Sequence, residues 1–418
     1  MSLKKIVFPI SSLFFAIGFL AIGYGMILTF VGVYLKELEV SNTVIGIINA
    51  SFFLGAVLSS IFSQKFISTV GHIRSFAAFA ALMVITFLMH SLFFNEVLWA
   101  ILRLLSGFSF YALLIILESW LNEKSSEESR GRILAIYTIV FYLATALGQL
   151  FLNIDDHFKE YIFTIGSTLV LFSVIFISLT KIKEPILEPF EKLSFPKIFS
   201  IVPLATVTSF ISGFLVGGFF SMAPVYILMQ GSSVELVSKF MIVSIIGGLI
   251  SQWPVGILSD RFGRRKLISI TSFLSAVTSF LFILYANEEI YLYTLGFCLG
   301  LSVFTLYPLA VARANDVVDE NKDIVEISRS LLFTYGIGSF LAPLIIGVGL
   351  SLTPNFLFIS FFILCLILSI YALTQERVKD KDLSVFVNIP VTSGAELPQL
   401  DPRQDEEYAH DSNNSYFQ

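Results

Sequence analysis

Long runs of apolar residues recur along this chain of 418 residues, and short polar breaks separate them. A helix needs roughly 20 predominantly apolar residues to cross a bilayer. Backbone groups in lipid must be hydrogen-bonded within the protein, which favours helices here, because the runs lack the alternation of β-barrel strands. The sequence therefore predicts an all-α membrane protein with twelve transmembrane helices. They fall near residues 8–35, 43–64, 75–94, 97–121, 132–153, 161–180, 200–228, 236–258, 267–286, 290–313, 327–350 and 354–374.

The composition excludes several other classes of protein. The chain is 56% hydrophobic and only 14% charged, whereas a soluble domain carries about 25% charged residues. Its basic residues form short loop clusters, which are not the footprint of a nucleic-acid-binding domain. Cys298 and Cys365 lie inside apolar runs and are interpreted as packing residues, and the histidines lack metal-ligand spacing. We expect no metal, no cofactor, no catalytic residues and no nucleic-acid partner.

Basic residues gather in one set of loops, which predicts the orientation of the chain. The opposite loops hold little beyond Lys36 and Lys159 and are otherwise acidic. Lys- and Arg-rich loops stay in the cytoplasm. Because the number of spans is even, both termini are expected there. The basic loops include Arg74, Arg130, Arg132, Arg261, Arg264, Arg265 and Lys266.

A long polar break divides the chain into two halves. Residues 1–180 form an N-terminal six-helix half, residues 181–199 a cytoplasmic loop, and residues 200–375 a C-terminal six-helix half. Residues 376–418 are polar and lack periodicity, so we expect a disordered cytoplasmic tail.

The two halves also share weak sequence similarity. VGHIRS from Val70 matches FGRRKL from Phe262 at an offset of 192, and GFSFY from Gly107 matches GLSVF from Gly300 at 193. FYLATALGQ from Phe141 loosely matches YGIGSFLAP at 194. Three matches at nearly one offset indicate an internal repeat. Parallel repeats of six helices are typical of transporters that hold substrate near the membrane midplane.

One loop carries a recognisable motif. GILSDRFGRRK, from Gly256 to Lys266, resembles the G-x-x-x-D-R-x-G-R-R/K signature of the Major Facilitator Superfamily, and it lies at the equivalent place between spans eight and nine. Arg103-x-x-x-Gly107 resembles the second motif of that family. SQWPVG, VFTLYP and ESWL are similar to stretches of its poorly characterised bacterial YcaD-like branch. The resemblance covers about residues 8–375. It implies two pseudo-symmetric halves in the bacterial inner (plasma) membrane.

The resemblance implies a gate around this loop. Asp260 would accept hydrogen bonds from the start of span five, near Gly131, and hold the cytoplasmic side shut together with Arg261, Arg264 and Arg265. Gly263 allows the tight turn. The first copy of the loop reads STVGHIR, so Ser68 replaces the acid and the gate should be asymmetric. We also expect gate ion pairs from Asp316 and Asp319 near the second loop.

Span four carries two charged residues. Arg103, Gly107, Tyr111 and Glu118 fall on one helical face, which the resemblance directs toward the central cavity, and about 22 Å separates Arg103 from Glu118 along the axis. Arg103 is interpreted as an anchor for an anion or polar group, or else as a structural residue. Glu118 is interpreted as a partner of Arg74, Arg130 or Arg132 in the gate, or else as a protonatable coupling residue.

Several uncharged residues complete the expected pathway. Asn49 is an amide inside a span and must find a partner there, either on a neighbouring helix or on a ligand. Spans one, seven and ten, which the resemblance assigns to the pathway, contribute aromatic residues that either contact substrate or pack between helices. These residues are Tyr24, Phe219, Tyr226, Phe304 and Tyr307.

These features favour a secondary transporter that works by alternating access as a monomer. Its expected partners are the lipid bilayer and a small, polar, neutral or anionic organic substrate, with proton coupling left open. A Walker-type phosphate loop is missing, and no acidic residue lies in the middle of a span. The alternatives are efflux of amphipathic compounds and a non-transporting membrane sensor with the same fold. An enzyme is disfavoured, because the spans hold no nucleophile–base pair.

Overall fold

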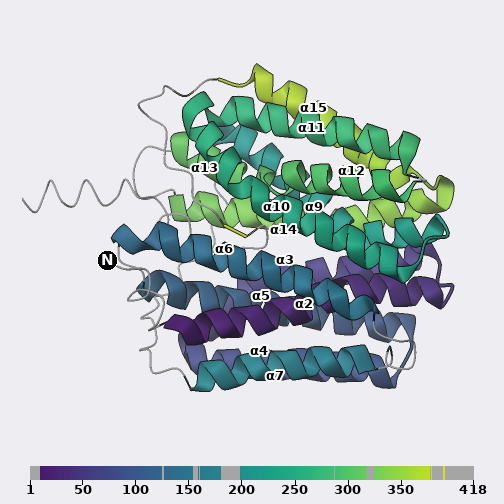
Figure 1. The fold of residues 1–418 in the computed structure, drawn as a ribbon. Coiled ribbons are helices and arrows are strands. Elements are labelled where there is room, and N and C mark those ends of the chain that lie inside the picture. The colour runs from purple at the N-terminus through teal and green to yellow at the C-terminus, as the bar shows by residue number, and fades with distance from the viewer. Residues whose placement is uncertain are drawn as a thin grey trace, which may run out of the picture.

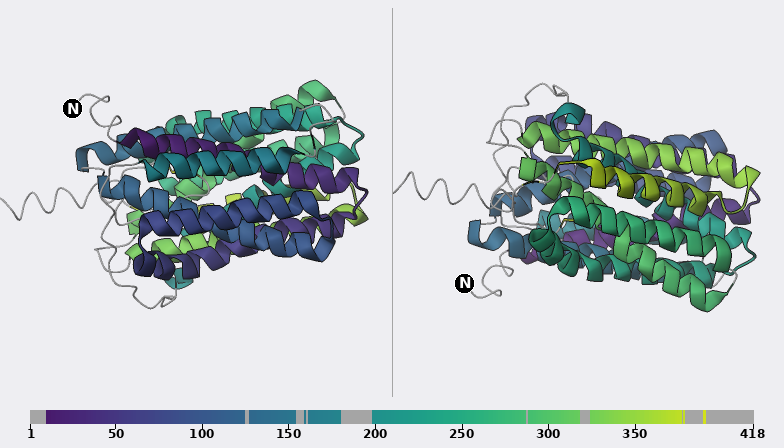
Figure 2. Two further views of the ribbon diagram at one scale, coloured as in Figure 1. Left: turned by 90° about the horizontal axis from the view of Figure 1, so that it is seen from below. Right: turned by 90° about the horizontal axis from the view of Figure 1, so that it is seen from above.

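The chain folds into a long bundle of helices whose ends gather at two faces (Figure 1). The computed structural model describes residues 10–124, 127–153, 159, 161–179, 198–286, 288–317, 324–376, 378 and 389–390. Within these residues there are helices, turns and bends but no strands. The two further views in Figure 2 show that the long helices of both halves lie along one common axis.

The N-terminal half lies below the C-terminal half in Figure 1. Its helices are α2 (Ser11–Glu37), α3 (Asn42–Val70), α4 (His72–Leu92), α5 (Glu96–Lys124), α6 (Glu127–Leu150) with the 3-10 turn η2 (Phe151–Asn153), and α7 (Ile162–Ser178).

The C-terminal half repeats this series after the short α8 (Ile198–Ile201). Its helices are α9 (Pro203–Met229), α10 (Val234–Phe262), α11 (Arg264–Tyr285), α12 (Glu289–Val303), α13 (Leu306–Val317), α14 (Ile324–Leu352) and α15 (Phe356–Thr374).

The predicted membrane spans are confirmed. Among the described residues, 11 helical stretches are long and apolar enough to cross a membrane, and α7 is a shorter apolar helix. Several helices run past the predicted ends, because a helix can continue through polar residues that lie beyond the hydrocarbon. Thus α3 and α10 extend to Val70 and Phe262, where Gly71 and Gly263 stop them with φ of 94° and 85°. Such positive φ values favour glycine.

The tenth span is broken, whereas the sequence predicts one continuous helix there. Phe304 and Thr305 separate α12 from α13. Pro308 has no N–H to donate to the carbonyl four residues earlier, which is that of Phe304. The side chain of Gln252 on α10 donates to this carbonyl instead, at 3.1 Å. The break therefore leaves no unsatisfied carbonyl at Phe304.

Equivalent glycines support the internal repeat. Gly107 of α5 packs against the backbone of Phe52 on α3, and Gly300 of α12 packs against the backbone of Ser244 on α10. Small residues allow helix backbones to approach closely in membranes. Residues 52 and 244 are 192 apart, the same offset that relates the two loops. The repeat is therefore present in the packing of the helices as well as in the sequence.

The two ends of the bundle differ in charge. We call the end of the bundle where α3, α10 and α15 end the basic end, and the end that holds the α2–α3 and α9–α10 connections the acidic end (Figure 1). At the acidic end the halves meet closely. Gly46 packs against Pro343 and Gly347, and the Thr43 and Ser351 hydroxyls lie 3.4 Å apart. The described structure is therefore closed at the acidic end.

Candidate functional site

Arg103 is a buried cation whose charge is incompletely matched. Its side chain on α5 is only 1% exposed, and its guanidinium carbon lies 4.5 Å from the centre of the Phe52 ring. Its Nε and Nη2 atoms have no hydrogen-bond partner among the described residues. The cation–π contact offsets part of the cost of burying this charge, but it leaves two N–H donors without acceptors in the described part of the chain. An additional acceptor would therefore stabilise Arg103.

An aromatic cluster joins the two halves at the level of Tyr24. The Tyr24 ring stacks on Phe110 with centroids 4.1 Å apart and lies 6.1 Å from Phe52, the ring that Arg103 contacts. It also lies 6.5 Å from Phe220 of the C-terminal half, and Phe220 stacks on Phe304 at 5.8 Å. The structure thus brings Tyr24, Arg103 and Phe304 toward one region, together with Phe219, which packs edge-on against Phe304 at 5.4 Å.

A small cavity lies between the halves. Tyr111 of α5 lines it together with residues of α3, and Tyr335 and Ser339 of α14 close it from the other half. Its volume of about 10 Å³ is that of a site for about one water molecule. Tyr307 lies behind Tyr335, with ring centroids 4.8 Å apart. A solute larger than water can enter only if the helices move apart.

Amide side chains hold the halves together. Asn49 of α3 donates to the carbonyl of Ser221 on α9 at 3.2 Å, so it acts as a link between helices. Gln252 of α10 also approaches the hydroxyl of Tyr142 on α6, at 3.4 Å. Nothing in the sequence marks Ser221 or Tyr142, because neither residue type signals a partner more than 100 residues away.

Tyr226 lies apart from the aromatic cluster. Its ring packs edge-on against Phe358 of α15 at 4.9 Å, and its hydroxyl donates to Asn355 at 3.4 Å. These contacts bind α9 to α15 within the C-terminal half, which is a packing role.

Glu118 is buried beside a tyrosine that the sequence analysis does not identify. The Tyr137 hydroxyl of α6 donates to Glu118 Oε1 at 2.6 Å, and Glu118 is 1% exposed. Arg74 and Arg132 have exposed side chains and form no ion pair with Glu118 among the described contacts. The side chain of Arg130 lies outside the described residues. One partner of Glu118 is thus a neutral hydroxyl on the next helix.

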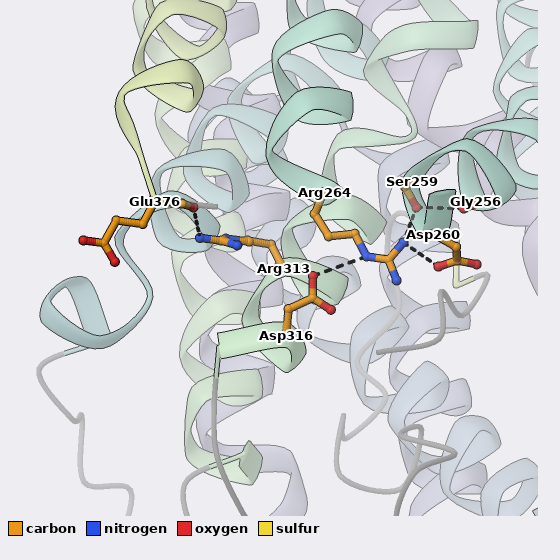
Figure 3. Close-up of polar contacts among 7 residues, drawn as sticks. All are labelled: Gly256, Ser259, Asp260, Arg264, Arg313, Asp316 and Glu376. Atoms are coloured by element: carbon orange, nitrogen blue, oxygen red, sulfur yellow. Dashed lines mark hydrogen bonds and ion pairs between the residues drawn. The ribbon is translucent and has the colours of Figure 1, made fainter. Parts of the chain in front are cut away.

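A charged cluster occupies the basic end of the C-terminal half (Figure 3). Arg264, 1% exposed at the start of α11, pairs with Asp260 of α10 at 2.6 Å and with Asp316 of α13 at 3.6 Å. Its guanidinium also donates to the hydroxyl of Ser259. The expected ion pair of Asp316 is therefore present, whereas Asp319 lies outside the described residues.

The described contacts of Asp260 remain within its own half. Gly131, at the expected receiving helix, is exposed, and a Cβ placed on it would have open space around it. Arg261 and Arg265 flank the cluster; the first is exposed and the second is half-buried. Contact between Asp260 and the start of span five stays a prediction.

Arg313 is a member of this region that the sequence analysis does not single out. It lies on α13 with 7% exposure and donates to the carbonyl of Glu376 at 2.8 Å. An arginine at the end of the tenth apolar run was the signal that could have identified it. Beyond the last helix, Ile389 is also buried, with 3% exposure, so part of residues 376–418 packs against the bundle.

Comparison with known proteins agrees with this architecture. The profile of the Major Facilitator Superfamily matches residues 13–322 and, in a second match, residues 231–388. An uncharacterized transporter of this type, YcaD from Salmonella arizonae, is 26% identical over 337 residues, covering 80% of this chain and 87% of the relative. YcaD from Escherichia coli O6:K15:H31 is also 26% identical, over 84% of this chain and 91% of its own length.

Solved structures share the fold at low sequence identity. The nucleoside transporter NupG, as a D323A mutant, has a TM-score of 0.70 and 15% identity, covering 87% of this chain and 98% of that one. A partially occluded inward-open structure of the xylose transporter XylE from E. coli has a TM-score of 0.69 and 12% identity, covering 89% and 98%. At such identities the similarity establishes the fold alone.

Proposed function

Since the chain belongs to the Major Facilitator Superfamily and is a membrane transporter of that family, we propose that it moves a small organic anion by alternating access of its two halves. The proposal places the basic end and both termini in the bacterial cytoplasm, as the loop charges indicate. The pathway lies between two halves of one chain, which supports a monomer as the working unit.

The observation that carries the proposal is the incomplete pairing of Arg103. A carboxylate or phosphate on the substrate could accept hydrogen bonds from Nε and Nη2, the two donors without partners. The adjoining Phe52 and Tyr24 rings would contact the apolar part of the same molecule. The xylose and nucleoside named for the structural neighbours do not transfer to this chain, because only the fold is shared.

The experiment begins with a thermal-shift panel of organic anions and matched neutral analogues on the purified protein. Arg103→Gln should weaken binding of the best anion by about tenfold to 150-fold or more, because it removes at least one charge-assisted hydrogen bond worth about 1.5–3 kcal/mol. Arg103→Lys should be intermediate, since lysine keeps the charge but not the planar donor pair. Lys65→Gln removes an exposed charge from the same half and serves as the matched control.

Flux into proteoliposomes, with and without a pH gradient, then tests transport and proton coupling separately. Unchanged binding of the anion in Arg103→Gln would refute the role of Arg103 while leaving transport possible. The absence of flux for every stabilising solute under any gradient would refute transport by this chain.

A second candidate, efflux of amphipathic compounds, is supported by the aromatic cluster around Tyr24, Phe220 and Phe304. Stacking rings contact apolar molecules with little demand on polar groups. Everted vesicles that accumulate amphipathic dyes, but no small anion, would favour this function over the first.

A further inference from the structure

A basic pocket lies at the basic end of the C-terminal half, away from the cavity between the halves. Four cationic side chains line it, three from the start of α11 and one from α13. Its volume is about 10 Å³, so a group larger than water would rest at its mouth, beside the exposed Lys266, and not inside it. The residues that line it are Phe262, Gly263, Arg264, Arg265, Lys266, Arg313 and Val378.

Two of these cations donate hydrogen bonds to backbone carbonyls and not to carboxylates. Arg265 donates to the carbonyl of Gln375 at 2.5 Å, and Arg313 donates to the carbonyl of Glu376 at 2.8 Å. Figure 3 shows the Glu376 carboxylate pointing away from Arg313. A carbonyl orients a guanidinium but does not neutralise its charge, so positive charge stays at the pocket.

The carboxylates in this region pair with only one of the four cations. Asp260 and Asp316 both pair with Arg264. Among the described residues, no carboxylate forms an ion pair with Arg265, Lys266 or Arg313. The Nε atom of Arg265 is buried without a hydrogen-bond partner in that part of the chain. The pocket therefore offers donors and charge to an anion from outside the protein.

The surface beside the pocket faces lipid. Lys266 is exposed, and Ile270 and Leu274 follow it on the same face of α11 with exposures of 51% and 52%. Phe262 lines the pocket and is 47% exposed. Large apolar side chains exposed on a spanning helix contact acyl chains, and a lysine at the end of such a face reaches the headgroup level. The pocket and the apolar face together match an amphipathic ligand better than a soluble one.

We propose that the basic pocket binds the phosphate group of an anionic phospholipid whose acyl chains lie along the Ile270 and Leu274 face of α11. Basic residues near a membrane surface attract anionic headgroups, each with a favourable energy of about 1 kcal/mol. The lipid would hold α10, α11, α13 and the segment after α15 together at the basic end. The proposal does not rest on the identity of the transported solute or on transport itself.

The test uses the full chain in a neutral detergent. Dioleoylphosphatidylglycerol, dioleoylphosphatidylcholine and sn-glycerol 3-phosphate are titrated separately, and binding is followed by native mass spectrometry and thermal shift. Phosphatidylglycerol should bind at least tenfold more tightly than phosphatidylcholine. Lys266→Gln should weaken it about fivefold, and Arg265→Gln with Lys266→Gln roughly 25-fold, if each charge contributes about 1 kcal/mol.

Lys239→Gln is the matched control, because it removes one half-exposed charge from α10 at the acidic end. It should leave phosphatidylglycerol binding unchanged. Equal binding of the two lipids by the unaltered protein would overturn the proposal without depending on any variant. Retained binding in the double variant would assign the lipid to another surface. Glycerol 3-phosphate binding as tightly as the lipid would show a soluble-phosphate site and refute the lipid assignment.

Discussion

Replacing Gly46 by alanine should open the acidic end. A Cβ on Gly46 would overlap the carbonyl oxygen of Pro343 and come within 3.1 Å of the Gly347 Cα. Both are backbone atoms, so α3 and α14 would have to separate. Overpacking of this kind costs about 1–3 kcal/mol. If the open conformation relieves the overlap, the ratio of closed to open molecules should fall about fivefold to 150-fold.

Cross-linking measures this ratio. Cysteines placed at Thr43 and Ser351, whose hydroxyls lie 3.4 Å apart, should form a disulfide quickly in the closed conformation and slowly after Gly46→Ala. Gly18→Ala is the control, because a Cβ at Gly18 of α2 would lie 3.8 Å from Val140, an ordinary contact, and the glycine-to-alanine change has the same effect on helix propensity. An unchanged cross-linking rate in a folded Gly46→Ala protein would refute the inference that this contact closes the acidic end.

Two further substitutions test the contacts near the basic end. Tyr137→Phe removes the 2.6 Å hydrogen bond to Glu118 and should lower the free energy of unfolding by about 1.5–3 kcal/mol, because a buried carboxylate loses a donor. Denaturant unfolding in detergent measures this free energy. A change below about 0.5 kcal/mol, which is the size expected for surface residues, would contradict the prediction. Asp260→Asn weakens the ion pair with Arg264 and should slow turnover in proteoliposomes. Ligand affinity should change by no more than about twofold, since a gate residue acts on the conformational equilibrium. A large loss of affinity would instead place Asp260 at the binding site.

Much of the fold could be predicted from the sequence, because crossing a bilayer is a local property of each segment. Apolar length predicted the spans, and the offset of about 192 predicted the repeat that the glycine contacts of Gly107 and Gly300 reproduce. The break at Phe304 was harder to predict from the sequence. Pro308 signals a kink, but it does not show that Gln252 supplies the missing donor.

The candidate site depended far more on tertiary structure. Helical periodicity placed Arg103 and Glu118 on one face of span four, but it could not say which groups that face would meet. Glu118 meets Tyr137, and Tyr226 meets Phe358 away from the aromatic cluster. The sequence by itself determined which segments cross the membrane, how the halves repeat and which end is basic, because these follow from hydropathy and charge along the chain. Only the tertiary structure decided which buried polar groups are paired, because those contacts depend on how closely helices far apart in the chain approach one another.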